Sequence, residues 1–376
     1  MMKVSIIGVK GYPIVYGGYE TLVKALVERW KDKDLELTVY CHASLFPEKP
    51  TLLNGVKLIY LPAIEKKSLT QLTHSFLSTL HVCFSKTHIV LYVNVANAPL
   101  GFLPRLFGKK TIINVDGMEW LRPKWKGIGA IYYKFCVKIV KYFFNAVVTD
   151  ASEMQRIYEN QFDTKSTIIT YGAENPIQYS NEILTKYNLT PNEYYLVVGR
   201  MIPDNNLDLI IDGYLNALSP KKLVIIGDDI FKGSFASSIH NNIRGNQNII
   251  LTGYVRNYDQ LCTFYKYCFA YIHGHEYGGT NPTMITALNE GCLILALDTP
   301  FTREMLDNGI YGIYFKKNSS DLNVVISSVE QKKFNDNLLE FRKKGKQRVE
   351  EKYNWNDIAD QYIELFNQTI SRENKF

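Results

Sequence analysis

The sequence predicts an α/β protein built from two doubly wound parallel sheets. Its 376 residues suit two domains. In both halves, short apolar runs typical of buried strands alternate with segments of helical periodicity. A stretch rich in Pro, Asn, Ser and Thr at 172–192 separates the halves. We therefore expect an N-terminal domain over 1–175, a linker over 176–192, a C-terminal domain over 193–352, and a C-terminal helix over 353–376 that packs back on the first domain.

The individual elements follow from this alternation. Apolar runs such as KVSIIG and YYLVVG predict strands at 3–8, 35–41, 56–61, 88–93, 111–115, 146–150, 194–199, 222–227, 248–252, 268–273 and 292–297. Helical spacing predicts helices at 18–31, 69–84, 127–145, 151–161, 206–218, 257–266, 282–290 and 302–307, followed by helical segments to the C-terminus. Because the strands are apolar throughout, helices should cover both faces of each sheet. Such domains bind ligands at the carboxyl ends of their strands, so the expected site is the cleft between two facing domains.

The composition excludes several classes of protein. Hydrophobic residues make up 46% and charged residues 21%, which is ordinary for a globular protein and excludes disorder, collagen and coiled coil. The most apolar stretches, 89–107 and 128–148, are interrupted by Asn, Pro or Lys, and the N-terminus lacks the pattern of a signal peptide. We therefore expect a cytoplasmic protein with no membrane-spanning helix.

The net charge of +6 is unevenly distributed along the chain. Residues 1–175 hold 22 Lys and Arg against 14 Asp and Glu, whereas 176–376 hold 21 against 23. Segment 105–141 is strongly basic and rich in aromatic residues, and lysines at i, i+4 and i+7 share one face of its predicted helix. Such a helix fits the surface of an anionic membrane. The alternative is a solvated lysine face over a buried aromatic core.

A glycine-rich segment, GVKGYPIVYGGYE at Gly8–Glu20, follows the first predicted strand. Gly17 and Gly18 precede a helix that begins near Tyr19, and the backbone amides and positive end of that helix suit an anionic group. The segment matches neither the dinucleotide fingerprint nor the P-loop. The alternative is a structural turn that binds nothing.

The sharper glycine-rich segment is YIHGHEYGGTNPTMITALNEG at Tyr271–Gly291. The amides of 279–281 are expected to face a phosphate, just before a helix that begins at Pro282. His273 and His275 have the spacing of a metal-binding pair. Without a third ligand, a polar pocket wall is the favoured interpretation.

The segment VVGRMIPDNNLD at Val197–Asp208 leaves the first strand of the second domain. Arg200 therefore lies at the carboxyl end of that strand, where a guanidinium can hold a diphosphate at two points. The alternative is a surface arginine paired with Asp204.

The segment NVDGMEWLRPKW at Asn114–Trp125 follows another buried strand. Asp116 and Glu119 are placed to orient a sugar or to accept a hydroxyl proton. The tryptophans can stack on sugars or anchor at a membrane. The alternative is a helix cap at Asp116.

Taken together, four segments resemble glycosyltransferase family 4, whose GT-B architecture has two facing Rossmann-like domains. The nearest resemblance is to its bacterial rhamnosyltransferase branch. The segments occur in the family's order: Ile6–Thr21, Asp116–Trp125, Val197–Asn206 and His273–Pro282.

The resemblance implies a role for each matching position. It implies that Arg200, Asp116 and Glu119 are catalytic. The implied donor-binding residues are Gly17, Gly18, Arg200, Asn205, His273, Gly278, Gly279, Thr280, Asn281 and Thr286. The implied acceptor-binding residues are Tyr16, Trp120, Arg122 and Trp125. No metal site and no cofactor are implied.

The sequence departs from the family pattern at three positions. Many members carry a lysine where this chain has Asn205, and a pair of glutamates where it has Gly278 and Thr286. The second glutamate usually binds the ribose hydroxyls, so Thr286 suggests a donor with one ribose hydroxyl fewer, such as dTDP-rhamnose. Arg303 is a candidate for the missing cation.

The predicted function is transfer of a hexosyl group, such as rhamnose from dTDP-rhamnose, to a lipid-linked saccharide in cell-surface polysaccharide synthesis. The resemblance implies a metal-independent reaction that retains configuration. Expected partners are the nucleotide-diphosphate sugar, a polyprenyl-diphosphate-linked saccharide and the anionic inner face of the cell membrane, and not nucleic acid. Two alternatives stay open: a nucleotide-sugar epimerase, which would isomerise the donor alone, and a catalytically inert sugar-nucleotide-binding subunit.

Overall fold

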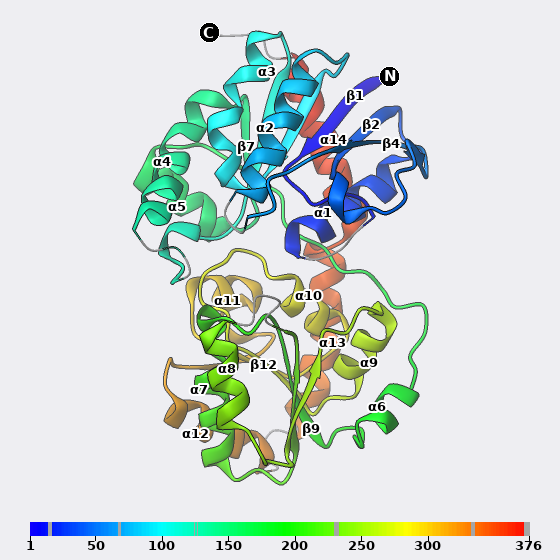
Figure 1. The fold of residues 1–376 in the computed structure, drawn as a ribbon. Helices are drawn as coiled ribbons and strands as arrows, with labels where there is room; N and C mark the ends of the chain where they lie inside the picture. The colour runs from blue at the N-terminus through cyan, green and yellow to red at the C-terminus, as the bar shows by residue number, and fades with distance from the viewer. Residues whose placement is uncertain are drawn as a thin grey trace. The chain divides into compact units, whose positions relative to one another are not determined.

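The computed structural model divides the chain into two compact units. Unit 1 comprises Met1–Tyr171 and Trp355–Phe376, and unit 2 comprises Gly172–Asn354. The structure describes residues 1–13, 17–66, 69–123, 125, 127–228, 233–331 and 335–371, without the side chains of 335–339 and 341–342. Within these ranges no helix is both long enough and apolar enough to cross a bilayer. Figure 1 shows that each unit combines a central sheet with surrounding helices.

Unit 1 is built on a sheet that has eight strands among the described residues, in the order β3-β4-β2-β1-β5-β6-β7-β8. Neighbouring strands are parallel except for the antiparallel pair β3 and β4. The strands are β1 (Met2–Ile7), β2 (Leu35–His42), β3 (Leu52–Leu53), β4 (Val56–Leu61), β5 (Ile89–Val93), β6 (Lys110–Val115), β7 (Ala146–Thr149) and β8 (Thr167–Ile168). The central strand β5 is buried along its whole length, as expected for a sheet covered on both faces.

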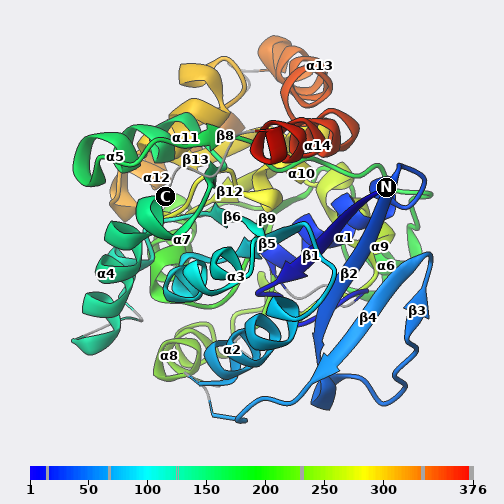
Figure 2. The same ribbon diagram turned by 90° about the horizontal axis from the view of Figure 1, so that it is seen from above.

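Helices lie on both faces of this sheet. They are α1 (Gly18–Trp30), α2 (Thr70–Cys83), α3 (Phe102–Leu106), α4 (Ile128–Phe143), α5 (Ser152–Phe162) and α14 (Trp355–Ser371), with short 3-10 turns η1 (Ala43–Leu45), η2 (Val95–Leu100) and η3 (Glu119–Leu121). Figure 2 shows α2 and α3 on one side of the central strands and α14 on the other. Right-handed crossovers require this arrangement, because the chain runs outward from β1 in both directions.

The C-terminal helix α14 is part of the core of unit 1. The Trp30 indole donates to the Ala359 carbonyl at 3.0 Å and packs edge-on against Phe366. The Asn114 side-chain amide donates to the Tyr362 hydroxyl at 2.7 Å. Helix α14 therefore supports the end of β6, two residues before Asp116.

Unit 2 is built on a parallel sheet that has six strands in the described part of the chain, in the order β11-β10-β9-β12-β13-β14. The strands are β9 (Tyr194–Val198), β10 (Lys222–Ile226), β11 (Ile249–Gly253), β12 (Ala270–His273), β13 (Ile294–Leu297) and β14 (Ile313–Phe315). The chain runs from β9 outward to β11 and then returns to β12 on the other side of β9. The strand order therefore reverses between β9 and β12, where doubly wound sheets bind their ligands.

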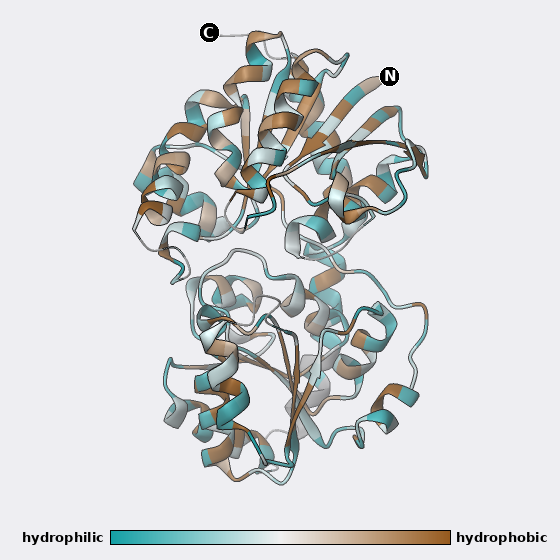
Figure 3. Ribbon diagram, viewed as in Figure 1, coloured by the Kyte–Doolittle hydropathy of each residue, from teal (hydrophilic) through white to brown (hydrophobic). Residues whose placement is uncertain are grey.

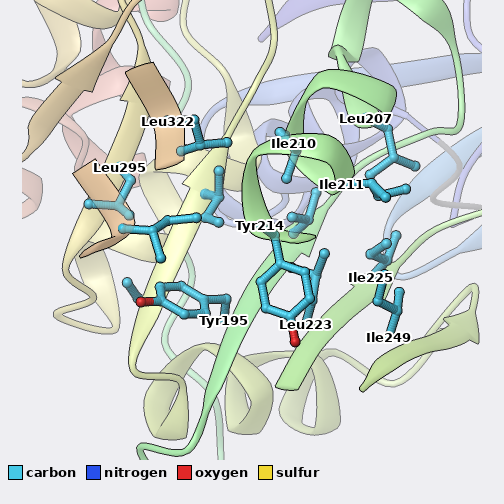
Figure 4. Close-up of a cluster of buried hydrophobic side chains, with 14 of the residues drawn as sticks. Tyr195, Leu207, Ile210, Ile211, Tyr214, Leu223, Ile225, Ile249, Leu295 and Leu322 are labelled. Atoms are coloured by element: carbon cyan, nitrogen blue, oxygen red, sulfur yellow. The ribbon is translucent and has the colours of Figure 1, made fainter. Parts of the chain in front are cut away.

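The helices of unit 2 pack on both faces of this sheet. They are α6 (Glu182–Lys186), α7 (Leu207–Ala217), α8 (Ser234–Asn242), α9 (Tyr258–Tyr267), α10 (Pro282–Asn289), α11 (Pro300–Met305), α12 (Ser319–Glu330) and α13 (Asn335–Lys352), with 3-10 turns η4 (Pro203–Asn205) and η5 (Asp307–Gly309). Figure 4 shows side chains of α7 meeting those of β9 and β10 in the core of this unit. In Figure 3 the strands of this sheet are coloured hydrophobic.

The predicted α/β class with two parallel sheets is confirmed, with local differences. The helix expected at 302–307 begins at Pro300, because Thr299 and Thr302 cap each other's backbone. Helix α8 was not predicted, since its Ser, His and Asn residues give little hydrophobic periodicity. Strand β14 was also missed, because three residues are too short for a pattern.

Candidate functional site

Two hollows lie in unit 2 at the carboxyl ends of β9 and β12, where the strand order reverses. One is lined in part by Gly199, Arg200 and Asn205, and the other in part by Gly278 and Gly279. The side chain of His275 lines both. The structure thus brings together the arginine segment and the glycine-rich turn that the sequence singles out.

Glycines keep the backbone segments around the first hollow close together. A Cβ atom on Gly274 would collide with the Asn205 carbonyl oxygen, and one on Gly227 would collide with the Gly199 carbonyl oxygen. The Asn205 side-chain amide also donates to the Arg200 carbonyl at 2.7 Å. Asn205 therefore fixes the loop that presents Arg200.

Arg200 is exposed and borders this hollow. In the described part of the chain its guanidinium takes part in no ion pair, so the alternative pairing with Asp204 is not observed. Asp204 is instead buried, and its backbone carbonyl accepts from the Glu276 amide at 3.0 Å. The guanidinium is thus available to a ligand.

The wall between the hollows is polar. The Tyr271 hydroxyl lies 2.9 Å from His273 Nδ1 and 2.9 Å from the Thr283 hydroxyl. The Asn281 side-chain nitrogen lies 3.0 Å from His275 Nδ1. Burial lowers the pKa of His273 to about 3, so this imidazole is neutral near pH 7. The histidines form the pocket wall favoured from the sequence.

Helix α10 begins at this wall. Asn281 caps it by accepting from the Thr283 amide at 3.0 Å, while the Asn281 amide itself donates to Met305 Sδ at 3.4 Å. Thr280 is buried and does not line either hollow. Of the turn expected to bind a phosphate through its amides, Gly278 and Gly279 line the second hollow. Their backbone is therefore the part of this turn best placed to bind a phosphate.

Thr286 lies in the second turn of α10 and is nearly buried. Its hydroxyl donates to the Pro282 carbonyl at 3.0 Å, so it is satisfied within the helix. Arg303, the candidate for the missing cation, is paired with Asp298 at two points, with N–O distances of 2.6 and 2.8 Å.

In unit 1, Asp116 follows the end of β6 and lies among phenols. The Tyr171 hydroxyl donates to Asp116 Oδ2 at 3.0 Å, and the Asp116 amide donates to the Tyr19 hydroxyl at 3.3 Å. Burial raises the pKa of Asp116, while hydrogen bonds from the two tyrosines oppose that rise. Sequence reasoning missed both tyrosines as site residues.

Gly17 and Gly18 lie at the start of α1, in the same unit. Gly17 is the N-cap of α1, and a Cβ atom on Gly18 would lie 3.6 Å from the Tyr171 hydroxyl. Gly18 therefore lies beside the phenol that is bonded to Asp116, whereas Gly17 lies beside Glu20. Tyr16, predicted to bind the acceptor, lies outside the described residues.

Glu119 is held at both carboxylate oxygens. Its Oε1 lies 2.7 Å from Arg122 Nε, and its Oε2 accepts from the Trp125 indole at 2.8 Å. These contacts suit Glu119 to shaping the segment after β6 rather than to accepting a proton. Arg122 and Trp125 are tied to that carboxylate, and Trp125 also packs on the ring of Tyr133.

Trp120 corrects a sequence expectation. Its side chain is only 6% exposed and packs edge-on against Tyr158 and Phe162. A ring enclosed in this way offers no open face to a sugar, so Trp120 is a core residue.

Two family models match separate parts of the chain. Residues 181–348 match the model described as glycosyl transferases group 1. Residues 1–49 and 102–174 match a model described as a domain of unknown function, DUF1972. The first match contains Arg200 and the glycine-rich turn, and the second contains Asp116.

Three solved structures resemble nearly the whole chain. Sucrose-phosphate synthase from Thermosynechococcus elongatus has 14% identity and a TM-score of 0.80, covering 98% of this chain and 99% of that one. Anabaena HepE has 13% identity and a TM-score of 0.77, covering 98% and 100%. A glycosyltransferase from Rickettsia africae has 15% identity and a TM-score of 0.76, covering 99% of each chain. The comparison with curated proteins gives no match.

These matches confirm the predicted GT-B architecture of two parallel-sheet domains. The protein is a glycosyltransferase, and its unit 2 carries the group 1 glycosyltransferase domain. Family 4 and the rhamnosyltransferase branch stay predictions.

Proposed function

We propose that the protein transfers a rhamnosyl group from dTDP-rhamnose to a lipid-linked saccharide at the cytoplasmic face of the membrane. The reaction retains configuration and serves cell-surface polysaccharide synthesis. One observation carries the proposal. The exposed guanidinium of Arg200 borders one hollow, and the glycine turn before α10 lines a second hollow that shares His275 with the first.

A nucleoside diphosphate gains negative charge as the glycosidic bond breaks. Arg200, the bare backbone at Gly278 and Gly279, and the positive end of α10 are suited to stabilise that charge. His273 contributes no net charge to the site, because its imidazole is neutral. Anabaena HepE, which shares the fold, has been solved with UDP and with UDP-glucose, and this supports a nucleotide-sugar donor.

Asp116 is the residue we assign to the acceptor. Its carboxylate can accept a hydrogen bond from the attacking hydroxyl and so orient it. Tyr171 holds Oδ2 at 3.0 Å, which fixes the direction of the carboxylate. Removal of the hydroxyl proton is assigned to a phosphate oxygen of the donor, by resemblance to the family.

The deoxyribose preference rests on Thr286. A carboxylate at this position would hold both ribose hydroxyls with charge-assisted hydrogen bonds worth about 1.5–3 kcal/mol each. Thr286 carries no charge, and its hydroxyl is already bonded to the Pro282 carbonyl. The site therefore loses little when the ribose lacks its 2′-hydroxyl.

Isothermal titration of dTDP against UDP tests the nucleotide. We expect dTDP to bind at least as tightly as UDP, and Thr286→Glu to improve UDP binding by about tenfold without improving dTDP. Clearly tighter binding of UDP by the natural protein would contradict the deoxyribose preference.

A donor screen with a polyprenyl-diphosphate saccharide, followed by mass spectrometry, tests the transfer itself. The expected product is heavier by one deoxyhexosyl residue when dTDP-rhamnose is supplied. Transfer of a different hexosyl group would correct the sugar. An isomerised donor with no glycosylated product would favour the epimerase instead.

A further inference from the structure

Helix α2 of unit 1 is polar on its buried side and apolar on its exposed side. The buried positions are His74, Ser75, Ser78, Thr79, Val82 and Cys83. The exposed large side chains on the same helix and just after it are Phe76, Leu80 and Phe84. The buried hydroxyls are satisfied, since Ser78 donates to the His74 carbonyl at 2.8 Å and Thr79 lies 2.8 Å from the Tyr92 hydroxyl. A helix facing only water would have the opposite distribution.

The apolar surface continues onto α3 and α4 through ring contacts. Phe84 meets Phe107 with ring centroids 5.1 Å apart, and Phe102 meets Phe143 at 5.3 Å. Phe84 is 80% exposed, so its contact with Phe107 leaves most of the ring open to solvent. Figure 2 shows α2, α3 and α4 near one another on the same side of the sheet.

Helix α4 extends the surface along its length. Its exposed apolar side chains Ile128, Ile131, Phe135 and Tyr142 recur at intervals of three, four and seven residues, which places them on one helix face. We call the surface formed by these side chains together with Phe84, Leu106 and Phe107 the apolar face of unit 1. The ring contact of Phe84 with Phe107 and the hydrogen bond from Arg105 to the Tyr142 carbonyl join these elements. Exposed apolar side chains gathered on neighbouring elements in this way mark a docking site.

The elements that carry the apolar face are rich in basic residues, although Lys141 of α4 is paired with the exposed Asp163. Between Glu65 and Asp150 the sequence contains two acidic residues, Asp116 and Glu119, and twelve Lys and Arg. Asp116 is bound by Tyr171 and Glu119 by Arg122, so neither carboxylate offsets the surrounding lysines at the surface. Lys134 and Lys138 are exposed on α4, and in the described part of the chain no ion pair involves them.

We propose that the apolar face of unit 1 docks on an anionic lipid bilayer, with Phe84 and Phe107 entering the acyl boundary and Lys134 and Lys138 contacting the headgroups. Apolar insertion combined with lysines is the combination that an anionic bilayer binds. A second copy of the chain is disfavoured, because a two-fold interface would place the same lysines opposite one another. This inference deepens the proposed function by naming how the enzyme reaches a lipid-linked acceptor, but the binding itself needs no catalysis.

Vesicle flotation of the whole protein tests the docking surface. The vesicles contain phosphatidylcholine alone or mixed with phosphatidylglycerol. We expect flotation with the mixed vesicles and little with phosphatidylcholine alone. Phe84→Ser combined with Phe107→Ser should weaken partitioning by at least about tenfold. Lys134→Gln combined with Lys138→Gln should weaken it by about thirtyfold, from roughly 1 kcal/mol per lysine.

Ile177→Ser in unit 2 is the matched control, because Ile177 is 93% exposed but lies outside the apolar face. It should float like the natural protein, and thermal unfolding confirms that each variant is folded. Equal flotation of the phenylalanine variant and the control would overturn insertion. Absence of flotation on mixed vesicles would overturn lipid docking altogether. It would also be overturned if the natural protein formed a dimer and, among the variants, only the phenylalanine variant were monomeric.

Turnover with a short-chain, water-soluble acceptor separates this inference from the proposed function. The phenylalanine variant should keep its rate with that acceptor while losing vesicle binding. Vesicle binding without any glycosyl transfer would refute the proposed function and leave the docking surface standing.

Discussion

Units 1 and 2 each contain a sheet with polar groups at the carboxyl ends of its parallel strands, but the chemical nature of those polar groups differs. In unit 2 the hollows are lined by glycine backbone, the neutral imidazole of His273, the His275 side chain and the exposed cation Arg200. In unit 1 the corresponding edge holds the half-buried carboxylate Asp116, which accepts a hydrogen bond from the Tyr171 phenol. The first arrangement suits a ligand that brings negative charge, and the second suits a ligand that brings hydroxyls.

The contrast also separates the pH behaviour of the two units. His273 is neutral across the physiological range because burial holds its pKa at about 3. In unit 1, burial raises the pKa of both Asp116 and Glu20. The acid limb of activity should therefore originate in unit 1, because Asp116 must be ionised to orient the acceptor hydroxyl. Stability lost on acidification should instead come from groups such as His273 in unit 2, whose folded pKa lies below its ordinary value.

The largest effect on activity is expected from removing the cation of unit 2. Arg200→Ala should lower kcat by at least about a hundredfold, because the departing diphosphate loses a preorganised cation. Steady-state turnover with donor and acceptor measures the effect. Unfolding temperature should not change, since Arg200 is exposed.

Arg244→Ala provides the control for net charge, as Arg244 is also exposed and in unit 2 but lies away from both hollows. It should leave turnover within about twofold of the natural rate. A near-natural rate for Arg200→Ala would mean that the diphosphate binds elsewhere.

The next largest effect is expected from the carboxylate of unit 1. Asp116→Asn should lower kcat/KM for the acceptor on the order of tenfold to a hundredfold, because a charge-assisted hydrogen bond to the hydroxyl is lost. Donor affinity, measured by calorimetry, should change little. Asp34→Asn, an exposed carboxylate in the same unit, is the control. Equal loss of donor affinity would contradict the division of roles between the units.

Sequence patterns were sufficient for the parts of both sites that lie next to a strand end. Arg200 and Asp116 each follow an apolar run directly, so their position at the carboxyl edge follows from strand assignment alone. Tyr171 could not be assigned to Asp116 in this way, because 55 residues separate them and their contact depends on how β8 joins the sheet. Tyr362 reaches Asn114 across 248 residues for the same reason.

The orientation of α2 was also beyond the sequence pattern. Its periodicity predicted a helix at 69–84, and the structure has one at Thr70–Cys83. Hydrophobicity alone would bury Phe76 and Leu80, yet the buried side carries Ser75 and Ser78. Trp120 shows the converse error, since an aromatic residue in a basic segment was assigned to a ligand and is enclosed in the core.

A smaller effect tests the phenols of unit 1. Tyr171→Phe removes a hydrogen bond to the charged form of Asp116, so the pKa of that carboxyl should rise further and the acid limb of the pH–rate profile should move to higher pH. The loss of rate should therefore be greater at low pH than at high pH, where it should be roughly tenfold or less.

Tyr158→Phe is the matched control for this prediction. Tyr158 is a buried phenol in the same unit, and in the described part of the chain its hydroxyl has no hydrogen-bond partner. Its pH–rate profile should coincide with that of the natural protein. A parallel loss of rate at every pH for Tyr171→Phe would mean that Tyr171 has only a structural role.

The smallest effect concerns Glu20, which distinguishes the two units by stability rather than by rate. Burial raises the pKa of Glu20, although the Lys10 amide donates to its Oε1 at 3.2 Å and opposes the rise. A carboxyl whose pKa is higher in the folded state stabilises the fold most at acidic pH. That stabilisation is lost as the pH rises through the folded pKa.

Glu20→Gln removes the buried charge and keeps the hydrogen-bond acceptor, so it should raise the unfolding temperature at pH 7 by roughly 2 °C and have no such effect at pH 4. Glu28→Gln on the exposed side of the same helix should do neither. If Glu20→Gln lowered the unfolding temperature at pH 7, the ionised carboxylate would be a net stabiliser of unit 1, and burial would not be the dominant influence on its pKa.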